Sequence, residues 1–275
     1  MIKPKTRTFG MRHGIQRHGG SVIHAFTLTV LLLMWFPIAT LVILSVSGDG
    51  LLAFPPQSLT LDWYIDVFTS DRAKDAIFNT LKIGLVATPI SITVATLTVI
   101  GIEKYEFRGK PLVLLLVIAK LLIPGVVGAV AVFQAAEAIG IQGYWVVVLV
   151  HVIATLPFAS LVMLETFSNF DESIEAAAMD LGANEITTFR TVTIPNMITG
   201  IIAATLLTFT FSFNEFIYTY FVRNTGTTTL PVYLWNRITY GLDPSINAIS
   251  VIFLVVATAL IALTAAVSSV RKLIT

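Results

Sequence analysis

Residues 143–164 read GYWVVVLVHVIATLPFASLVML, a run that contains no Asp, Glu, Lys or Arg. About 20 such residues cross the roughly 30 Å hydrocarbon core of a bilayer as an α-helix, at about 1.5 Å per residue. Because lipid offers no water to pair with backbone N–H and C=O groups, the segment has to pair them internally, as a helix does. The run therefore predicts a transmembrane helix.

Five further stretches meet the same criterion. They are residues 22–46, 79–100, 111–133, 197–222 and 246–270. Only 12% of the 275 residues are charged and 56% are hydrophobic, whereas a soluble domain carries roughly 25% charged residues, so soluble and disordered chains are excluded. We expect an all-α membrane protein with six transmembrane helices, in which residues 1–20 form a tail and residues 21–275 a single transmembrane domain.

The basic residues that flank these spans are unequally divided between the two sides of the membrane. Eleven Lys and Arg lie before the first span, after the last one and in the loops at 101–110 and 165–196, against four in the other loops. Since Lys and Arg accumulate on the cytoplasmic side, we expect both termini to be cytoplasmic. A cleaved signal peptide over residues 1–48 is a competing interpretation, although the apolar run of about 25 residues is long for a signal core.

The outer loop at 51–78 contains a short amphipathic stretch. Its apolar members are Leu61, Trp63, Tyr64, Ile65, Val67 and Phe68. Aromatic residues of this kind favour the headgroup level, which predicts an interfacial helix; a plain solvated loop is the alternative.

The inner connection at 165–196 has the pattern of a helix rather than of a loop. Residues 171–181 begin with carboxylates, which the helix dipole favours, and continue with three alanines of high helix propensity. Gly182 is the residue type that ends helices with a positive φ. A second short helix is expected to run from its cap Asn184 to residue 191, and Pro195 suits the first turn of the next span.

The first of these short helices is predicted to have one apolar face. Ile174, Ala177, Ala178 and Leu181 recur at the spacing i, i+3, i+4 and i+7. Small side chains on this face would allow another protein to approach closely, or the helix could lie on the membrane surface. Helical spacing does not distinguish the two.

This connection resembles the cytoplasmic EAA loop of permease subunits of type I ATP-binding-cassette (ABC) importers. That pattern reads Glu-Ala-Ala, three residues, Gly, nine residues, Ile, one residue, Leu-Pro. The Ala, Gly and Pro positions match at Ala177, Ala178, Gly182 and Pro195. The glutamate position holds Ala176, and Glu175 lies one residue earlier. The resemblance implies coupling to an ATPase through Ile174, Glu175, Ala177, Ala178, Leu181, Gly182, Ala183 and Pro195.

The C-terminal half resembles the polyamine (spermidine/putrescine) branch of these permeases. The matching segments are FSFNEF at 211–216, TLP at 229–231 and PSINA at 244–248. The same branch resembles uptake systems for opines and phosphonates, so the expected solute is a small amine-bearing or zwitterionic compound.

The resemblance also implies partners for this chain. They are a second, non-identical homologous permease, two ABC ATPase subunits and an external solute-binding protein received by the loops at 51–78 and 223–243. The implied location is the inner (plasma) membrane of a prokaryote. ATP and Mg²⁺ would be bound by the ATPase subunits, because this chain has no P-loop: Gly109 and Lys110 are followed by Pro111.

Other chemistry is not supported by the sequence. The net charge of +1 favours no nucleic-acid partner, and the chain contains no Cys. No metal-binding His pattern, cofactor motif or catalytic cluster is visible, so we expect a transport subunit and no enzyme. A self-contained secondary transporter or channel is the alternative function.

Polar side chains within the predicted spans indicate a substrate pathway, because charge in lipid is costly and is usually functional or paired. The candidate residues are Lys120, Phe211, Asn214, Glu215 and Tyr218. A carboxylate framed by aromatic rings suits a cation, whereas an unpaired lysine suits an anionic or zwitterionic solute. His151 is expected to be a hydrogen-bonded core residue, and Pro124 with Gly125 is expected to permit a kink in the third span.

Overall fold

The computed structural model describes residues 12–49, 54–224, 226–240 and 244–274. Within this part the only strand-like pairing is an isolated bridge between Ser47 and Leu59, which confirms the all-α prediction. Five described helices are long and apolar enough to span a membrane, and a bent pair makes up to six. The long helices are α1 (Arg12–Leu44), α3 (Asp71–Lys104), α6 (Tyr144–Ser168), α9 (Ile194–Phe213) with the helical residues before it, and α12 (Ser245–Ile274).

The run that opened the sequence analysis is the central helix of the fold. In α6, 67% of the most apolar window is buried, compared with 44% in α3 and none in α1. Small residues such as Ala87 and Ala95 of α3 and Ala159 of α6 are fully buried, so the helices approach one another closely. The Thr155 hydroxyl of α6 also donates to Ser91 Oγ of α3 at 3.1 Å.

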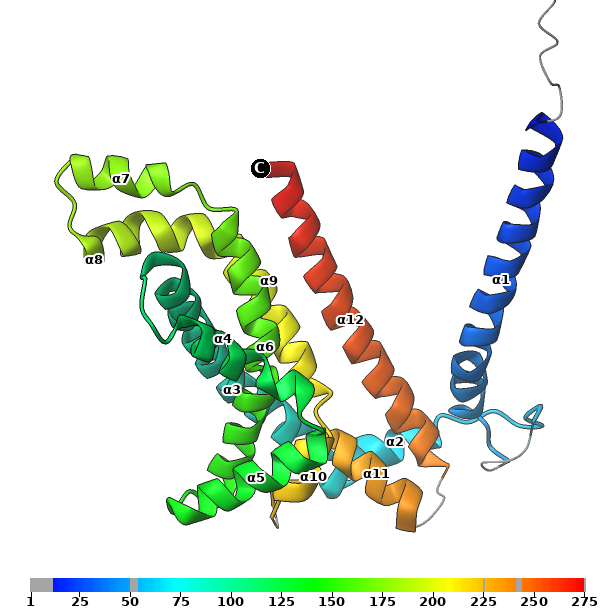
Figure 1. The fold of residues 1–275 in the computed structure, drawn as a ribbon. Coiled ribbons are helices and arrows are strands. Elements are labelled where there is room, and N and C mark those ends of the chain that lie inside the picture. Colours follow the sequence, from blue (N-terminus) through cyan, green and yellow to red (C-terminus); the bar gives the residue numbers. More distant parts are fainter. Residues whose placement is uncertain (1–11, 50–53, 225, 241–243, 275) are drawn as a thin grey trace, which may run out of the picture.

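The two ends of the molecule differ in what they carry (Figure 1). The helical hairpin of α7 (Glu172–Asp180) and α8 (Glu185–Thr188) lies at one end, together with the start of α1 and the end of α12. The opposite end carries α2 (Asp62–Thr69), α5 (Gly125–Ala138), α10 (Ile217–Val222) and α11 (Leu230–Tyr240). The start of α1 and the end of α12 therefore lie on the α7 side; that this side is cytoplasmic stays a prediction.

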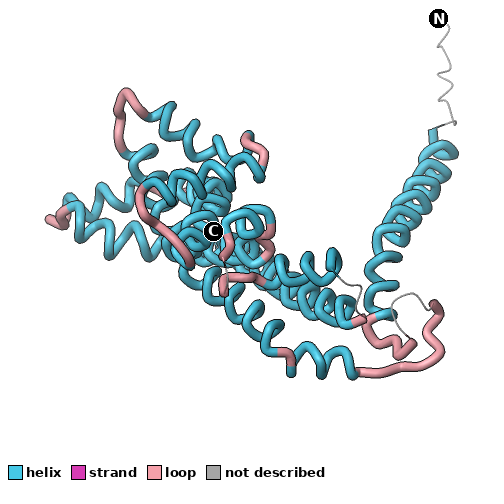
Figure 2. Tube along the Cα trace, turned by 90° about the horizontal axis from the view of Figure 1, so that it is seen from below, coloured by secondary structure: helices cyan, strands magenta, loops and turns pink. Residues whose placement is uncertain are grey.

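The first helix stands apart from the bundle of α3, α6 and α9 in both views (Figures 1 and 2). It begins at Arg12, so part of the predicted tail is helical, and residues 1–11 lie outside the described residues. In the outer loop, α2 confirms the predicted amphipathic helix, with Val67 buried, while its position at the headgroups stays a prediction.

The prediction of one continuous third span is wrong. The span is divided into α4 (Lys110–Leu122) and α5 (Gly125–Ala138), which are bent by 119° relative to each other. Pro124 has no N–H for the helical ladder and disfavours helical geometry in the residue before it; accordingly Ile123 is extended, with ψ 127°. What was expected as a kink is a full break.

The prediction of a continuous fifth span over 197–222 is also wrong. The helix stops at Phe213, and α10 begins only at Ile217. At this break the Glu215 side chain satisfies a backbone group, because its Oε1 accepts from Tyr218 N at 2.7 Å, and Asn214 Nδ2 adds a second hydrogen bond to Thr210 O at 2.7 Å. Interrupted helices within a membrane depend on such replacement partners.

At its inner end the fifth span is longer than predicted. The second short helix does not stop at residue 191 but continues through a π-helical turn, Phe189–Thr193, into α9. Pro195 therefore lies inside a continuous helix. The wider π-helical turn immediately before it accommodates a residue that cannot donate a backbone hydrogen bond.

Candidate functional site

The α7–α8 hairpin is built from two short capped helices. Asp171 caps α7 by accepting from Ser173 N at 3.0 Å, and Asn184 caps α8 by accepting from Thr187 N at 2.8 Å. Hydrogen bonds from the Ser173 side chain and then its backbone lower the pKa of the Asp171 carboxyl, so the cap persists well below neutral pH. Gly182 turns the chain with φ +93°, as its position predicted.

One face of this hairpin is uncovered by the rest of the described chain. Leu181 is 91% exposed, Ile174 is 41% exposed, and Ala177 is exposed between them. Ala178 and Ala183 are half-buried at the turn, while Pro195 is exposed at the start of α9. A leucine that is almost fully exposed at the tip of a helical hairpin is a surface available to a partner.

Glu175 lies on the inner side of α7 and faces the chain's own helices. It is only 5% exposed, and its carboxylate receives Lys104 Nζ of α3 at 2.5 and 2.6 Å. The Thr193 hydroxyl donates to the same carboxylate from the π-helical turn. Lys104 also lies 5.9 Å from the ring centroid of Phe167 in α6. We call this cluster of Lys104, Phe167, Glu175 and Thr193 the inner joint.

Four of the five predicted pathway residues are brought together where the two broken spans meet. Lys120 Nζ lies 5.4 Å from the ring centroid of Phe158 and 5.5 Å from that of Tyr218. Phe211 stacks on Phe158 with centroids 3.8 Å apart. Glu215 interacts electrostatically with Lys120 without forming a direct ion pair. Asn214 is the exception, since its amide bonds to its own helix.

Glycines allow these broken helices to pack. A Cβ on Gly128 of α5 would come within 2.3 Å of the Tyr218 hydroxyl, and one on Gly125 within 3.2 Å of Ile217. Lys120 and Glu215 therefore lie beside a close contact between α5 and α10. We call Lys120, Phe158, Phe211, Glu215 and Tyr218 the pathway cluster.

His151 is a fully hydrogen-bonded core residue, which confirms its predicted structural role. It is 1% exposed, with Nδ1 2.8 Å from Ser212 Oγ and Nε2 2.7 Å from Thr219 Oγ1. Because Ser212 precedes the break in the fifth span and Thr219 follows it, His151 holds the two halves of that span together.

Replacing His151 with Phe should therefore destabilise the protein. The ring would still fill the space, but the buried Ser212 and Thr219 hydroxyls would lose their partner, at about 1–3 kcal/mol for each group left unpaired. Thermal unfolding in detergent should show a lower midpoint. Adding Ser212→Ala and Thr219→Val should recover part of the loss. An unchanged midpoint in the His151→Phe variant would contradict the inference that His151 holds the two halves of the fifth span together.

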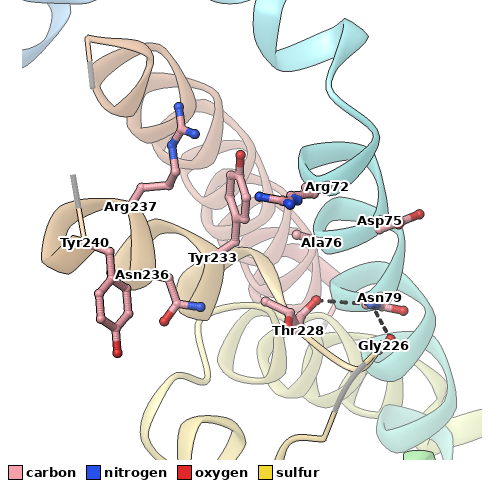
Figure 3. A pocket seen from close by; sticks show the side chains of 10 residues that line it. All are labelled: Arg72, Asp75, Ala76, Asn79, Gly226, Thr228, Tyr233, Asn236, Arg237 and Tyr240. Atoms are coloured by element: carbon pink, nitrogen blue, oxygen red, sulfur yellow. Dashed lines mark hydrogen bonds between the residues drawn. The ribbon is translucent and has the colours of Figure 1, made fainter. Parts of the chain in front are cut away.

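The end of the molecule opposite the α7–α8 hairpin, predicted to be the outer end, carries a pocket of about 710 Å³, which we call the outer pocket (Figure 3). It lies between the outer end of α3, the segment after α10 and α11. Its lining side chains include Arg72, Asp75, Asn79, Tyr233, Asn236 and Arg237. Asn79 Nδ2 donates to the carbonyls of Gly226 and Thr228 at 3.0 and 3.1 Å, which fixes that segment against α3.

Sequence reasoning missed two parts of these sites. In the sequence, Lys104 is only one of the basic residues that flank the predicted spans, and Phe158 has no polar neighbour that would mark it as part of a site. The partners of Lys104 are 71 residues away at Glu175. The only local signal was a basic residue at the inner end of one span and a displaced acidic residue in the inner loop.

Comparisons with known proteins agree with this architecture. Residues 8–274 match the family described as "Binding-protein-dependent transport system inner membrane component". A crystal structure of a bacterial ABC transporter involved in the import of the acidic polysaccharide alginate contains a chain that superposes with a TM-score of 0.73 at 18% identity. The alignment covers 98% of this chain and 100% of that chain, so the two share their fold.

Two curated relatives are similar in sequence over most of their length. The spermidine/putrescine transport system permease protein PotC of Haemophilus influenzae is 29% identical over 241 residues, covering 87% of this chain and 93% of that protein. The putrescine transport system permease protein PotI of Escherichia coli K12 is 29% identical over 229 residues, covering 80% and 81%.

Proposed function

This chain belongs to the family of binding-protein-dependent transport system inner membrane components, and from that membership we propose that it forms half of the translocation pathway of an ATP-driven importer. It is a multi-pass permease subunit of an ABC importer. The observation that supports coupling to an ATPase is the uncovered face of α7, where Leu181 is 91% exposed and Ala177 lies beside it. We assign this face to docking of an ATPase subunit rather than to the membrane surface.

Coupling would proceed by rigid-body movement. ATP and Mg²⁺ would be held by two partner ATPase subunits, whose closure would displace the α7–α8 hairpin. Because the hairpin follows α6 and continues into α9, its displacement would rock both helices and switch the pathway between outward and inward access. A second, homologous permease would supply the other half of the pathway, and an external solute-binding protein would dock on the outer loops.

The proposed solute is a small amine-bearing or zwitterionic compound. The two curated relatives are named as permeases of spermidine/putrescine and putrescine transport systems. In this chain, the Glu215 carboxylate among aromatic rings suits an ammonium group. Lys120 lies in the same pathway cluster and would repel a second cationic group. A solute with one amine and one acidic group would satisfy both charges.

Co-purification from the native membrane tests the energy source. A tagged chain extracted in mild detergent should bring down an ATPase subunit and a second permease in defined proportions. The matched control is the same extraction from cells that lack the ATPase subunit, in which solute uptake should also be lost. Uptake that continues without the ATPase would contradict the proposal and favour a self-contained secondary transporter.

A further inference from the structure

We infer, on the basis of the proposed docking of an ATPase on α7, that the ion pair between Lys104 and the buried Glu175 carries the movement of α7 into α3. The chain itself connects the hairpin only to α6 and α9, since α7 follows α6 and α8 continues into α9. The third helix of the central bundle, α3, has no covalent link to the hairpin near this end. Lys104, the last residue of α3, instead connects it to the hairpin non-covalently, through the ion pair with Glu175.

The geometry of the inner joint is that of a tight connection. Both carboxylate oxygens of Glu175 receive Lys104 Nζ, at 2.5 and 2.6 Å, and the Thr193 hydroxyl donates to one of them. Glu175 is 5% exposed, whereas 25% of the Lys104 side chain is exposed, so the carboxylate is the shielded partner of the pair. Charge-assisted hydrogen bonds are short and directional, and several of them on one buried carboxylate make the connection resist displacement.

The exposed ion pairs elsewhere in the described chain provide a contrast. Lys74 pairs with Asp71 in the first turn of α3, and Lys110 pairs with Glu106 in the loop just before α4; the two carboxylates are 92% and 91% exposed. Pairs of this kind contribute little and connect only residues that are already close in sequence. The Lys104–Glu175 pair joins residues 71 positions apart on two different elements.

The helix that receives this input extends to the outer pocket. With 34 residues, α3 is about 50 Å long at 1.5 Å per residue. Near its other end, Asn79 holds the carbonyls of Gly226 and Thr228, as Figure 3 shows, and Thr80 Oγ1 accepts from Leu230 N at 2.7 Å. Movement of α3 would therefore displace the segment that forms one wall of the outer pocket.

Lys104 and Glu175 are positioning residues in this scheme, and their role is measured by the ratio of solute transported to ATP hydrolysed. The test variant is Lys104→Met with Glu175→Gln, which removes the pair without leaving a buried charge unpaired. In proteoliposomes with the complete transporter, that ratio should fall at least fivefold, whereas the amount of ATPase that co-purifies should be unchanged. Lys104→Arg, which keeps the charge, should retain most of the ratio.

A covalent replacement gives a second, independent measurement. The chain contains no Cys, so Lys104→Cys with Glu175→Cys introduces the only two thiols of this subunit. A short reducible bifunctional methanethiosulfonate should restore coupled transport, and cleaving the link in the same sample should abolish it again. Because both states are measured on the same molecules, a failure of folding cannot produce the difference.

Several outcomes would overturn the inference. They are a wild-type transport ratio in the neutral double variant, equal transport before and after cleavage of the link, or transport only in the cleaved state. Absence of an ATPase from the wild-type complex would instead contradict the proposed function, so the two failures are distinguishable.

Discussion

Replacing Ala177 with Arg is expected to weaken binding of the ATPase subunit by at least about thirtyfold and to stop solute uptake, while insertion into the membrane stays intact. Ala177 lies on the exposed face of α7, beside Leu181 at 91% exposure. An arginine there would place an unpaired charge in the proposed interface, which costs about 2–5 kcal/mol. Each 1.4 kcal/mol corresponds to about a tenfold change in affinity. Co-purification and uptake measure the two effects.

Ala176→Arg is the matched control. The same side chain is introduced on the same helix at an exposed position, but Ala176 points away from the face formed by Ile174, Ala177 and Leu181. ATPase binding should be largely retained in this variant. Equal loss in both variants would mean that arginine disturbs the hairpin generally, and normal assembly of Ala177→Arg would contradict the docking face.

Glu215→Gln is expected to lower uptake by about ten- to a hundredfold. The glutamine keeps an oxygen that can accept from Tyr218 N, so the start of α10 retains its hydrogen bond while the charge is removed. A hydrogen bond to a charged group contributes about 1.5–3 kcal/mol, which corresponds to this range if the carboxylate meets an ammonium group of the solute. Initial uptake rates at several solute concentrations measure the loss.

Glu137→Gln is the control for this substitution, since Glu137 is exposed in α5 and has no described partner in the pathway cluster. Uptake should be unchanged there. Lys120→Met separates the solute classes: it should impair uptake of a zwitterion and improve uptake of a diamine. Normal uptake by Glu215→Gln would assign Glu215 to capping α10 alone.

The long helices and the hairpin were predictable because their signals are local. A run such as 143–164 must be helical in lipid whatever it packs against, and the spacing of Ile174, Ala177 and Leu181 defines one face before any tertiary contact exists. Gly182 and Asn184 likewise act on neighbouring backbone and have their predicted turn and cap geometry; Asp171, expected only as an acidic residue at the helix start, is its cap.

The breaks in the third and fifth spans were only partly predictable. Pro124 indicated a distortion of the third span, but the sequence does not distinguish a proline that kinks a helix from one that ends it. At 214–216 there is no proline, and an apolar run continues on both sides. The interruption is supported by contacts that sequence does not reveal: Glu215 accepts from the backbone N–H of Tyr218, and His151 bridges the hydroxyls of Ser212 and Thr219 on the two sides of the break.

The amino-acid sequence by itself determined the membrane class, the number of apolar runs and the exposed face of the inner hairpin, because each depends on hydrophobicity or spacing within one segment. Only the tertiary structure decided that Glu175 turns inward to Lys104 and that Lys120 and Glu215 share one aromatic cluster. The physical reason is that an electrostatic interaction depends on the distance between two side chains. For residues 71 and 95 positions apart in sequence, that distance is set by how α3, α6 and the broken helices pack.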